Sequence, residues 1–206
     1  MMVAMSLLQL SRAQACARRI NEVLSAEPSV KDRPQAARQV LPAPRGRVEF
    51  RDVSFRYAAS GSGDNVLSHI SFDVEPGKFV AIVGGTGTGK STLVNLIPRF
   101  YDVTGGAVLV DGVDVRDYPL EELRGRIGMV LQTNILFSGT IRENLLWGSP
   151  DATEEEMIQA AKDAQAYDFV MSFPDGFDTS MAQGGVNVSG GQKQRLCIAR
   201  AMLRKP

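Results

Sequence analysis

The stretch that decides the fold is Gly84-Gly85-Thr86-Gly87-Thr88-Gly89-Lys90-Ser91-Thr92. Its residues 84–91 match the pattern G-x-x-x-x-G-K-[ST] at every fixed position. The apolar run Phe79–Val83 precedes it, and a helix-like segment, Leu93–Ile97, follows it. A buried strand, a glycine-rich turn and a helix in this order are typical of a loop that holds the phosphates of a nucleoside triphosphate. The alternative, an ordinary glycine-rich turn with an incidental lysine, explains neither the full pattern nor its context.

The chemistry of a triphosphate accounts for the residue types in this loop. Backbone N–H groups wrap the phosphates only where the chain turns tightly and no Cβ blocks the approach, which suits Gly84, Gly85, Gly87 and Gly89. The helix that follows directs its positive N-terminal end at the same phosphates. We expect Lys90 to reach the β- and γ-phosphates, the Ser91 hydroxyl to bind Mg²⁺, and Thr86, Thr88 and Thr92 to complete the loop. The loop alone does not distinguish a kinase, a GTPase, a helicase or a transporter ATPase.

Alternating apolar residues predict strands on both sides of the loop. The segments 48–57 and 70–74 alternate apolar and polar side chains, and 107–110 and 127–131 are further strand candidates. Together with the helices, they predict an α/β fold.

The region 138–182 reads as mostly helical, and it is followed by a last helix through Leu203. Helix starts are marked by three capping-box pairs: Thr140 with Glu143, Thr153 with Glu156, and Ser189 with Gln192. The acidic run at 154–156 fits a helix N-terminus better than a catalytic site.

The N-terminal part has a different character. Residues 1–27 repeat apolar side chains at three- and four-residue steps, which predicts an amphipathic helix packed on a partner. Residues 28–46 contain four prolines and no period, which predicts a linker. The apolar start of the chain is too short to span a bilayer.

The composition excludes several classes of function. Among 206 residues, 23 are Lys or Arg and 23 are Asp or Glu, so the balance gives no support for a nucleic-acid partner. Two distant cysteines, Cys16 and Cys197, predict neither a disulfide framework nor a metal cluster. The single histidine, His69, makes a zinc site or a histidine-based nucleophilic mechanism improbable.

A second glycine pair, in Val188-Ser189-Gly190-Gly191-Gln192, begins the last helix. By itself this is an ordinary helix start, but beside a phosphate loop it is more specific. From about Val48 to its end, the chain resembles the nucleotide-binding domain of ATP-binding cassette (ABC) transporters. The resemblance implies an α/β fold that has a P-loop core with an antiparallel β subdomain and a helical subdomain. The resemblance rests on GGTGTGKST, on the signature segment VSGGQKQR, on Gln132 in MVLQTNILFSGTIRENL, and on Tyr57 after VSFR. The interval between Gln132 and Ser189 leaves room for a compact helical subdomain, about 138–185, but not for a long coiled coil.

The resemblance implies a role for each matched residue. Two such domains sandwich two ATP molecules, each between one domain's phosphate loop and the other's signature segment. Tyr57 would stack on adenine, although ordinary sheet packing also explains it. Residues 84–92 would hold the phosphates, and Lys90 and Gln132 would serve catalysis. Ser91 and Gln132 would bind or approach Mg²⁺, although Gln132 also fits a solvated turn. Ser189, Gly190, Gly191 and Gln192 would face the partner's ATP.

The N-terminal stretch SLLQLSRAQACARRINEVLSAEP resembles the place in exporter-type half-transporters where the last transmembrane helix enters the ATPase domain. It implies an ATPase domain at the cytoplasmic face of a membrane, joined to a transmembrane domain and paired with a second ATPase domain as a homodimer or heterodimer. The whole would couple ATP binding and hydrolysis to export.

Part of the family pattern is missing. In the family, a strand ending in Asp-Glu (the Walker B strand) and a later histidine follow the signature helix, and this sequence ends at Pro206 before them. We therefore expect a domain truncated before that strand, unstable and with little ATPase activity by itself. Two other interpretations stay open: an ATP-binding or regulatory subunit that completes a partner's site without hydrolysis, and an ABC ATPase without membrane domains.

Overall fold

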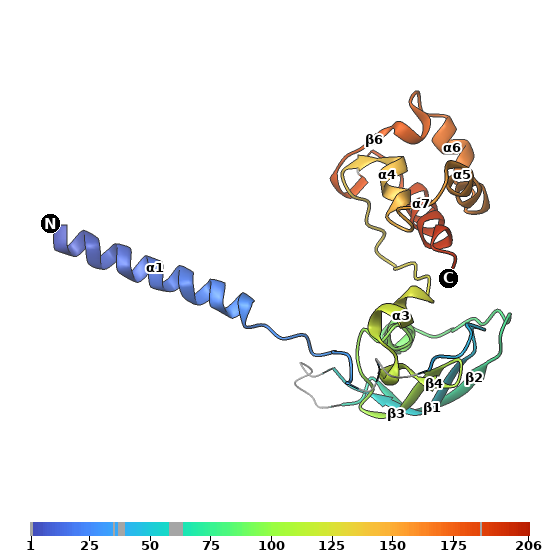
Figure 1. The fold of residues 1–206 in the computed structure, drawn as a ribbon, viewed down its shortest axis with the longest axis horizontal. Coiled ribbons are helices and arrows are strands. Elements are labelled where there is room, and N and C mark those ends of the chain that lie inside the picture. The colour runs from blue at the N-terminus through green and yellow to red at the C-terminus, as the bar shows by residue number, and fades with distance from the viewer. Residues whose placement is uncertain (1, 35, 37–39, 58–63, 186) are drawn as a thin grey trace.

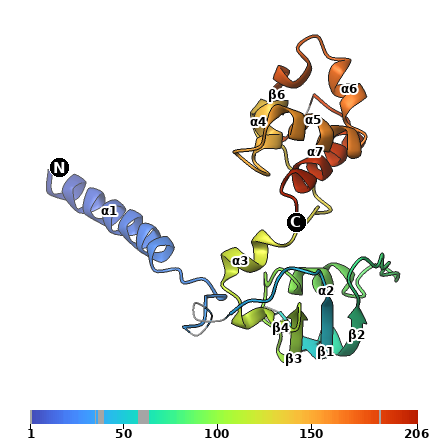
Figure 2. The same cartoon turned by 45° about the vertical axis from the view of Figure 1, so that its right-hand side comes forward.

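The computed structural model describes residues 2–34, 36, 40–57, 64–185 and 187–206, and arranges them as two lobes and a projecting helix (Figure 1). That helix, α1 (Met2–Leu24), extends away from both lobes in two views (Figures 1 and 2). It corresponds to the helix expected over 1–27. The apolar face of α1 is exposed in this structure and not packed on the expected partner. Leu10, Ile20 and Leu24 are 68%, 59% and 77% exposed. No helix among the described residues combines the length and apolarity needed to cross a membrane.

The sheet lobe is built on four antiparallel strands in the order β2-β1-β3-β4. They are β1 (Val48–Phe55), β2 (Leu67–Val74), β3 (Gly105–Val110) and β4 (Val113–Asp114), and the short 3-10 helix η2 (Val115–Asp117) follows. In the centre, Val48 pairs with Val74 on one side and with Val110 on the other. The strands expected from alternation around 48–57, 70–74 and 107–110 are confirmed, except that β1 ends at Phe55 and leaves Tyr57 beyond it.

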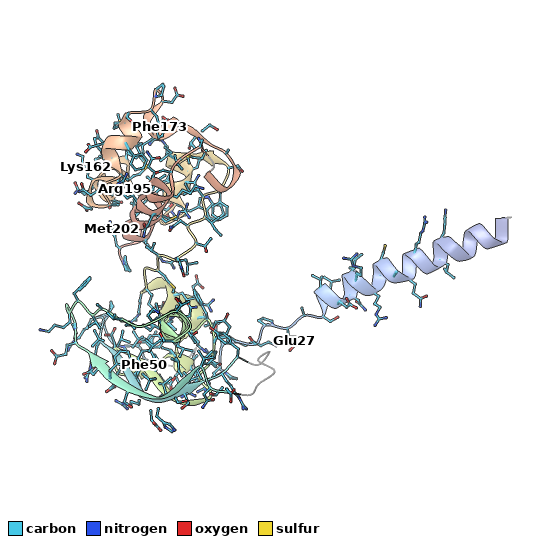
Figure 3. The ribbon with its side chains drawn as sticks, turned by 180° about the vertical axis from the view of Figure 1, so that it is seen from behind. Glu27, Phe50, Lys162, Phe173, Arg195 and Met202 are labelled. Atoms are coloured by element: carbon cyan, nitrogen blue, oxygen red, sulfur yellow. The ribbon has the colours of Figure 1, made fainter. Side chains whose placement is uncertain are left out.

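Two short helices complete the sheet lobe: α2 (Lys90–Leu96) and α3 (Leu120–Gly125). Their apolar side chains join those of the sheet in one core, which includes Phe50, Val53, Phe55, Val108, Val110, Leu93, Leu96, Tyr118 and Leu123. Figure 3 shows Phe50 on the sheet beneath these helices. This core fixes the start of α2, and therefore the phosphate loop, against β1 and β2.

Two expected strands are absent from the described structure, and these predictions are wrong. Residues 79–83 and 127–131 are extended but belong to no strand. Phe79 and Val83 are 98% and 93% exposed instead of buried. A strand inside a parallel sheet takes its hydrogen bonds from neighbouring strands. In the described structure neither segment is paired with a strand of the two sheets, β2-β1-β3-β4 and β5-β6.

The helical lobe follows, with its own core. It contains β5 (Gly139–Thr140), α4 (Ile141–Leu146), α5 (Glu154–Asp163), α6 (Tyr167–Met171), η3 (Gly176–Asp178), β6 (Ser180–Met181), η4 (Gln183–Gly185) and α7 (Gly190–Leu203). All three expected capping boxes form, at the starts of α4, α5 and α7. Figure 3 places Lys162, Phe173, Arg195 and Met202 in this lobe, apart from Phe50. Each lobe therefore packs around a separate hydrophobic cluster.

A buried amide joins α4 to α7 within the helical lobe. Asn144 is 1% exposed. Its Oδ1 accepts hydrogen bonds from the Phe137 N–H at 2.9 Å and from Arg200 Nη2 at 3.0 Å. Its Nδ2 donates to the carbonyl oxygens of Phe137 and Thr140 at 2.9 and 3.0 Å. One side chain thus satisfies all four of its hydrogen-bonding positions and holds the segment after Gln132 against the signature helix.

Replacing Asn144 with alanine is expected to lower the free energy of unfolding by about 2 kcal/mol, because buried partners on Phe137 and Arg200 lose their hydrogen bonds. Urea unfolding of the chain, followed by circular dichroism, measures this loss. Gln194→Ala, at an exposed position of α7, is the control and should change stability by less than about 0.5 kcal/mol. Equal effects of the two substitutions would contradict the role given to the buried amide.

Candidate functional site

The phosphate loop turns through two glycines in the left-handed region. Gly87 has φ +84° and Gly89 has φ +85°. A Cβ on Gly89 would lie 2.9 Å from Leu67 Cδ2 and 3.2 Å from the Val66 carbonyl oxygen. Glycine is therefore required at both positions by backbone conformation, and at Gly89 also by packing on β2. Gly84 and Gly85 do not have a positive φ. Of the four glycines expected to allow a tight turn, only Gly87 and Gly89 therefore have a backbone conformation that favours glycine.

Lys90, near the end of the phosphate loop, is hydrogen-bonded to the start of the loop. Lys90 Nζ donates to the carbonyl oxygens of Gly84 and Gly85 at 2.9 and 2.5 Å. The Thr88 hydroxyl also donates to the Gly85 carbonyl, at 3.0 Å. The ammonium group thus lies across the loop, where neutral carbonyl oxygens are its acceptors. A phosphate oxygen is a stronger acceptor for an ammonium, because the hydrogen bond is then between two charged groups.

The start of α2 is open to an anion. Its N-cap is Gly89, which has no side chain to cap the first N–H groups. Ser91 is exposed at this end, and no Cβ fills the space around Gly87. Open N–H groups, a hydroxyl and an ammonium are the donor set that a phosphate requires, and the hydroxyl is a ligand that Mg²⁺ accepts. The residues present therefore fit a nucleotide phosphate with its magnesium ion.

Gln132 lies at the same pocket as Lys90 and Ser91. The pocket has a volume of about 460 Å³, and α2 lines it together with Ile82 and residues 129–133. Gln132 itself is exposed at its surface. The structure thus brings Gln132 to the same pocket as the adjacent residues Lys90 and Ser91, although it is distant from them in sequence. Catalytic or magnesium-binding roles were expected for all three.

Tyr57 contacts Thr92, the last residue of the phosphate loop. Its hydroxyl is 3.0 Å from Thr92 Oγ1, in a hydrogen bond. Its ring makes edge contacts with Phe55 and Tyr101, with centroids 4.8 and 5.0 Å apart. Tyr57 therefore packs against the sheet lobe and also touches α2. Sequence reasoning offered sheet packing and base stacking as alternatives, and these contacts are compatible with both.

The signature segment lies on the helical lobe, away from this pocket. Ser189 caps α7, with its hydroxyl accepting from the Gln192 N–H at 3.3 Å, and the Gln192 side chain accepts from the Ser189 N–H at 2.8 Å. Gly190 and Gly191 have open space where a Cβ would be, and neither has a positive φ. Nothing in the described chain requires glycine there, although glycine weakens a helix.

Between the lobes runs an apolar groove that the sequence did not reveal. Its volume is also about 460 Å³, and residues of both lobes line it, among them Phe100, Arg124, Phe137, Cys197 and Arg200. Burial raises the pKa of the Cys197 thiol and lowers the pKa of the Arg200 guanidinium. Arg200 also donates to the Ile135 carbonyl at 3.1 Å, so α7 is bound to the segment after Gln132.

A phosphate loop before a short helix, an antiparallel sheet lobe and a separate helical lobe with a glycine-rich helix start define a P-loop nucleotide-binding domain. Residues 67–206 match the family described as ABC transporter. Because this match covers more than half of the sequence, the chain belongs to the ABC transporter family, as the resemblance of its motifs predicted. Members of this family are transporter ATPases that bind ATP.

Relatives place the chain near exporters. A Bacillus subtilis (strain 168) protein, YgaD, named as a multidrug export ATP-binding/permease protein, is 56% identical over 162 residues, which are 79% of this chain and 28% of YgaD. A Staphylococcus aureus (strain NCTC 8325 / PS 47) protein named in the same way is 50% identical over 171 residues, 82% of this chain and 29% of its own length. The chain therefore spans less than a third of these relatives.

A solved structure described as a bacterial Atm1-family ABC exporter with ATP bound superposes with a TM-score of 0.84 at 37% sequence identity. The superposition covers 93% of this chain and 32% of the exporter chain. The expected resemblance to the exporter branch and the expected α/β class are both confirmed. Because 93% of the chain is covered, the superposition extends over both lobes.

Proposed function

We propose that this chain is the ATP-binding domain of an exporter, and that it couples the binding and hydrolysis of ATP to transport across a membrane. One observation carries the proposal: Lys90, Ser91 and Gln132 line a single pocket at the open start of α2. The names of the relatives, which join export, ATP binding and permease in one protein, support the coupling to transport.

The proposed site uses the residues that the motifs indicated. The loop Gly84–Thr92 wraps the phosphates, and Lys90 exchanges the carbonyl oxygens of Gly84 and Gly85 for phosphate oxygens. Ser91 and Gln132 hold Mg²⁺, which neutralises charge on the β- and γ-phosphates when bound. Tyr57 receives the adenine ring on the aromatic cluster with Phe55 and Tyr101.

A second ATPase domain completes the site. Ser189, Gly190, Gly191 and Gln192 lie on the helical lobe and do not line the pocket of their own chain. Two glycines in the first turn of α7 lower helix stability and face open space. Close approach by another molecule is a physical reason to keep them. We propose that the approaching group is the γ-phosphate of ATP bound to the partner domain, in a homodimer or a heterodimer.

The membrane partner would be reached through α1. We propose that α1 leads to a transmembrane domain of the same transporter, which places both lobes at the cytoplasmic face of the membrane. The support is the amphipathic and unpacked state of α1 and the small share of each export relative that this chain spans.

The alternative, an ATP-binding subunit that does not hydrolyse, also has an observation in its favour. None of the described residues lining the pocket is a carboxylate or a histidine, so none is a strong acceptor for a proton from water. We propose that a polypeptide of residues 1–206 binds ATP with magnesium but turns it over slowly.

Gly191→Glu tests the shared site. In analytical ultracentrifugation, magnesium and ATP should promote association of the unchanged chain. The new carboxylate should weaken that association at least about tenfold through repulsion of the γ-phosphate, while the ATP affinity of the monomer stays the same. Gly125→Glu, at an exposed position of α3, is the control. Association that Gly191→Glu leaves unchanged would exclude the signature segment from the interface.

A further inference from the structure

The most buried charged side chain of the described residues lies outside the nucleotide pocket. Arg99 is 2% exposed and has φ +53°, just after α2 ends. Its Nε and Nη2 donate to the two carboxylate oxygens of Asp102 at 2.6 and 3.1 Å. Such a forked pair satisfies the charge of a buried arginine, yet it leaves donors free for other partners.

The remaining donors of Arg99 bind the backbone of distant segments. Nη2 donates to the Lys31 carbonyl at 3.1 Å, and Nη1 is 3.4 Å from the Arg116 carbonyl. Lys31 belongs to the proline-rich stretch 28–46 that was expected to be a linker. We call this stretch, together with the residues that flank it, the connector (residues 25–47). A buried arginine therefore holds the connector to the end of α2.

The two residues after Lys31 are also bound to the sheet lobe. Asp32 Oδ1 accepts from the Leu120 N–H at the first position of α3, at 2.8 Å. Arg33 Nη1 donates to Asp117 Oδ1 at 2.9 Å. Three consecutive residues, 31–33, thus make three different contacts with the lobe. This density of contacts is not expected of a flexible tether.

The connector is held again where it enters the sheet. Asp111 accepts from the backbone N–H groups of Arg45, Gly46 and Arg47 at 2.9 to 3.1 Å. Arg126 donates to the Pro42 carbonyl at 2.8 Å. The connector is therefore attached to the sheet lobe at residues 31–33 and again at residues 42–47.

The attachment points lie on the part of the chain that runs from the phosphate loop to Gln132. Helix α2 begins at Lys90 of the phosphate loop and is followed by Arg99, which holds Lys31. Helix α3 begins at Leu120, whose N–H donates to Asp32. The chain that follows α3 leads to Gln132. Residues 31–33 therefore contact Arg99, which follows α2, and the start of α3, after which the chain leads to Gln132. On the other side, they continue into α1, as Figure 3 shows around Glu27.

We propose that residues 31–33 are a docking segment and that Arg99 is its positioning residue, so that shifts of α2 and α3 on ATP binding are passed to α1 through the connector. This route is in addition to any contact through the helical lobe, and it rests on the proposed binding of ATP at the phosphate loop. The expected linker is thus, in its described residues, a segment fixed to the nucleotide-binding lobe.

Trypsin cleavage of the Lys31–Asp32 bond in the whole chain tests the proposal. Cleavage requires local release of the connector, so its rate reports the docked fraction. Arg99→Met, which keeps the buried volume, should raise the rate at least about tenfold by removing the bond to the Lys31 carbonyl. Asp117→Ala, a surface change that frees Arg33, should raise it about threefold without endangering the fold. Asp178→Ala, which breaks an ion pair with Arg142 in the helical lobe, is the control.

The effect of ATP on the cleavage rate shows whether Arg99 positions the connector in response to nucleotide or only stabilises the fold. Magnesium and ATP should slow the cleavage of the unchanged chain at least about threefold. In Arg99→Met, ATP should no longer change the cleavage rate, although the ATP affinity of this variant should stay within about twofold of that of the unchanged chain. Rapid cleavage of the unchanged chain, or a full response to ATP in both Arg99→Met and Asp117→Ala, would overturn the proposal. If the unchanged chain bound no ATP, the proposed function would be wrong. The roughly tenfold increase in cleavage rate expected for Arg99→Met without nucleotide would still show whether the connector is docked.

Discussion

Replacing Lys90 with alanine is expected to weaken the binding of ATP with magnesium by about 100-fold. The Lys90 ammonium lies across the phosphate loop and donates to the neutral carbonyl oxygens of Gly84 and Gly85. When phosphate oxygens replace them, two hydrogen bonds between charged groups form, each worth about 1.5 to 3 kcal/mol. Removing the ammonium forfeits this gain, and a loss of about 2.7 kcal/mol corresponds to a factor of about 100 in the dissociation constant. Isothermal titration calorimetry measures it directly.

Lys78→Ala is the matched control for this experiment. It removes the same charge from an exposed position of the sheet lobe that lies before the loop and does not line the pocket. It should change the dissociation constant by less than about threefold, because exposed charges interact weakly across solvent. Lys90→Arg would retain the charge but not the compact ammonium and should bind with intermediate affinity. Equal binding by the unchanged chain and by Lys90→Ala would show that nucleotide binds elsewhere.

Local chemistry explains what the sequence predicted well. Each capping box needs only a hydroxyl and a carboxylate or amide three residues apart, and the boxes at Thr140, Thr153 and Ser189 all form. Strands β1 and β2 follow from alternation because one face packs on a core within the same lobe. Such features depend on neighbours close in sequence or on a two-residue period.

Features that depend on distant partners were predicted less well. The run Phe79–Val83 has the composition of a buried strand, but strand formation needs neighbouring strands, which the described sheets do not provide. The proline-rich connector has the composition of a linker, yet a buried arginine 68 positions away holds it. Asn144 and Arg200 gave no periodic signal, because their role is a contact between α4 and α7.

The candidate site was predicted by two different means. The phosphate loop came from its own pattern, and the positive φ of Gly87 and Gly89 explains two of its fixed residue types. Gln132 could be associated with Lys90 only through the resemblance to a family, because no local pattern relates positions so far apart. The structure supplies the physical link, since the chain after α3 returns along α2 and lines the same pocket.

The second large effect concerns hydrolysis. A polypeptide of residues 1–206 is expected to turn over bound ATP at least about 100-fold more slowly than the ATP-binding region of YgaD under the same conditions, because a general base contributes about 10²–10⁴ in rate. The described lining of the pocket supplies one ammonium, two hydroxyls and two amides, which can bind and orient phosphate, but no carboxylate or imidazole. Single-turnover release of phosphate from a stoichiometric complex measures the chemical step separately from binding.

Mixing the two proteins then distinguishes the enzyme from the binding subunit. If the YgaD region supplies a complete site, its phosphate loop pairs with the signature segment of this chain, and turnover appears in the mixture at one of the two shared sites. Gly191→Glu in this chain should abolish that gain, whereas Lys90→Ala should leave it, since Lys90 serves the other site. Rapid phosphate release by the 206-residue polypeptide alone would instead mean that Gln132 or a residue outside the described pocket positions the attacking water, and the assignment of a slow, partner-dependent site would be wrong.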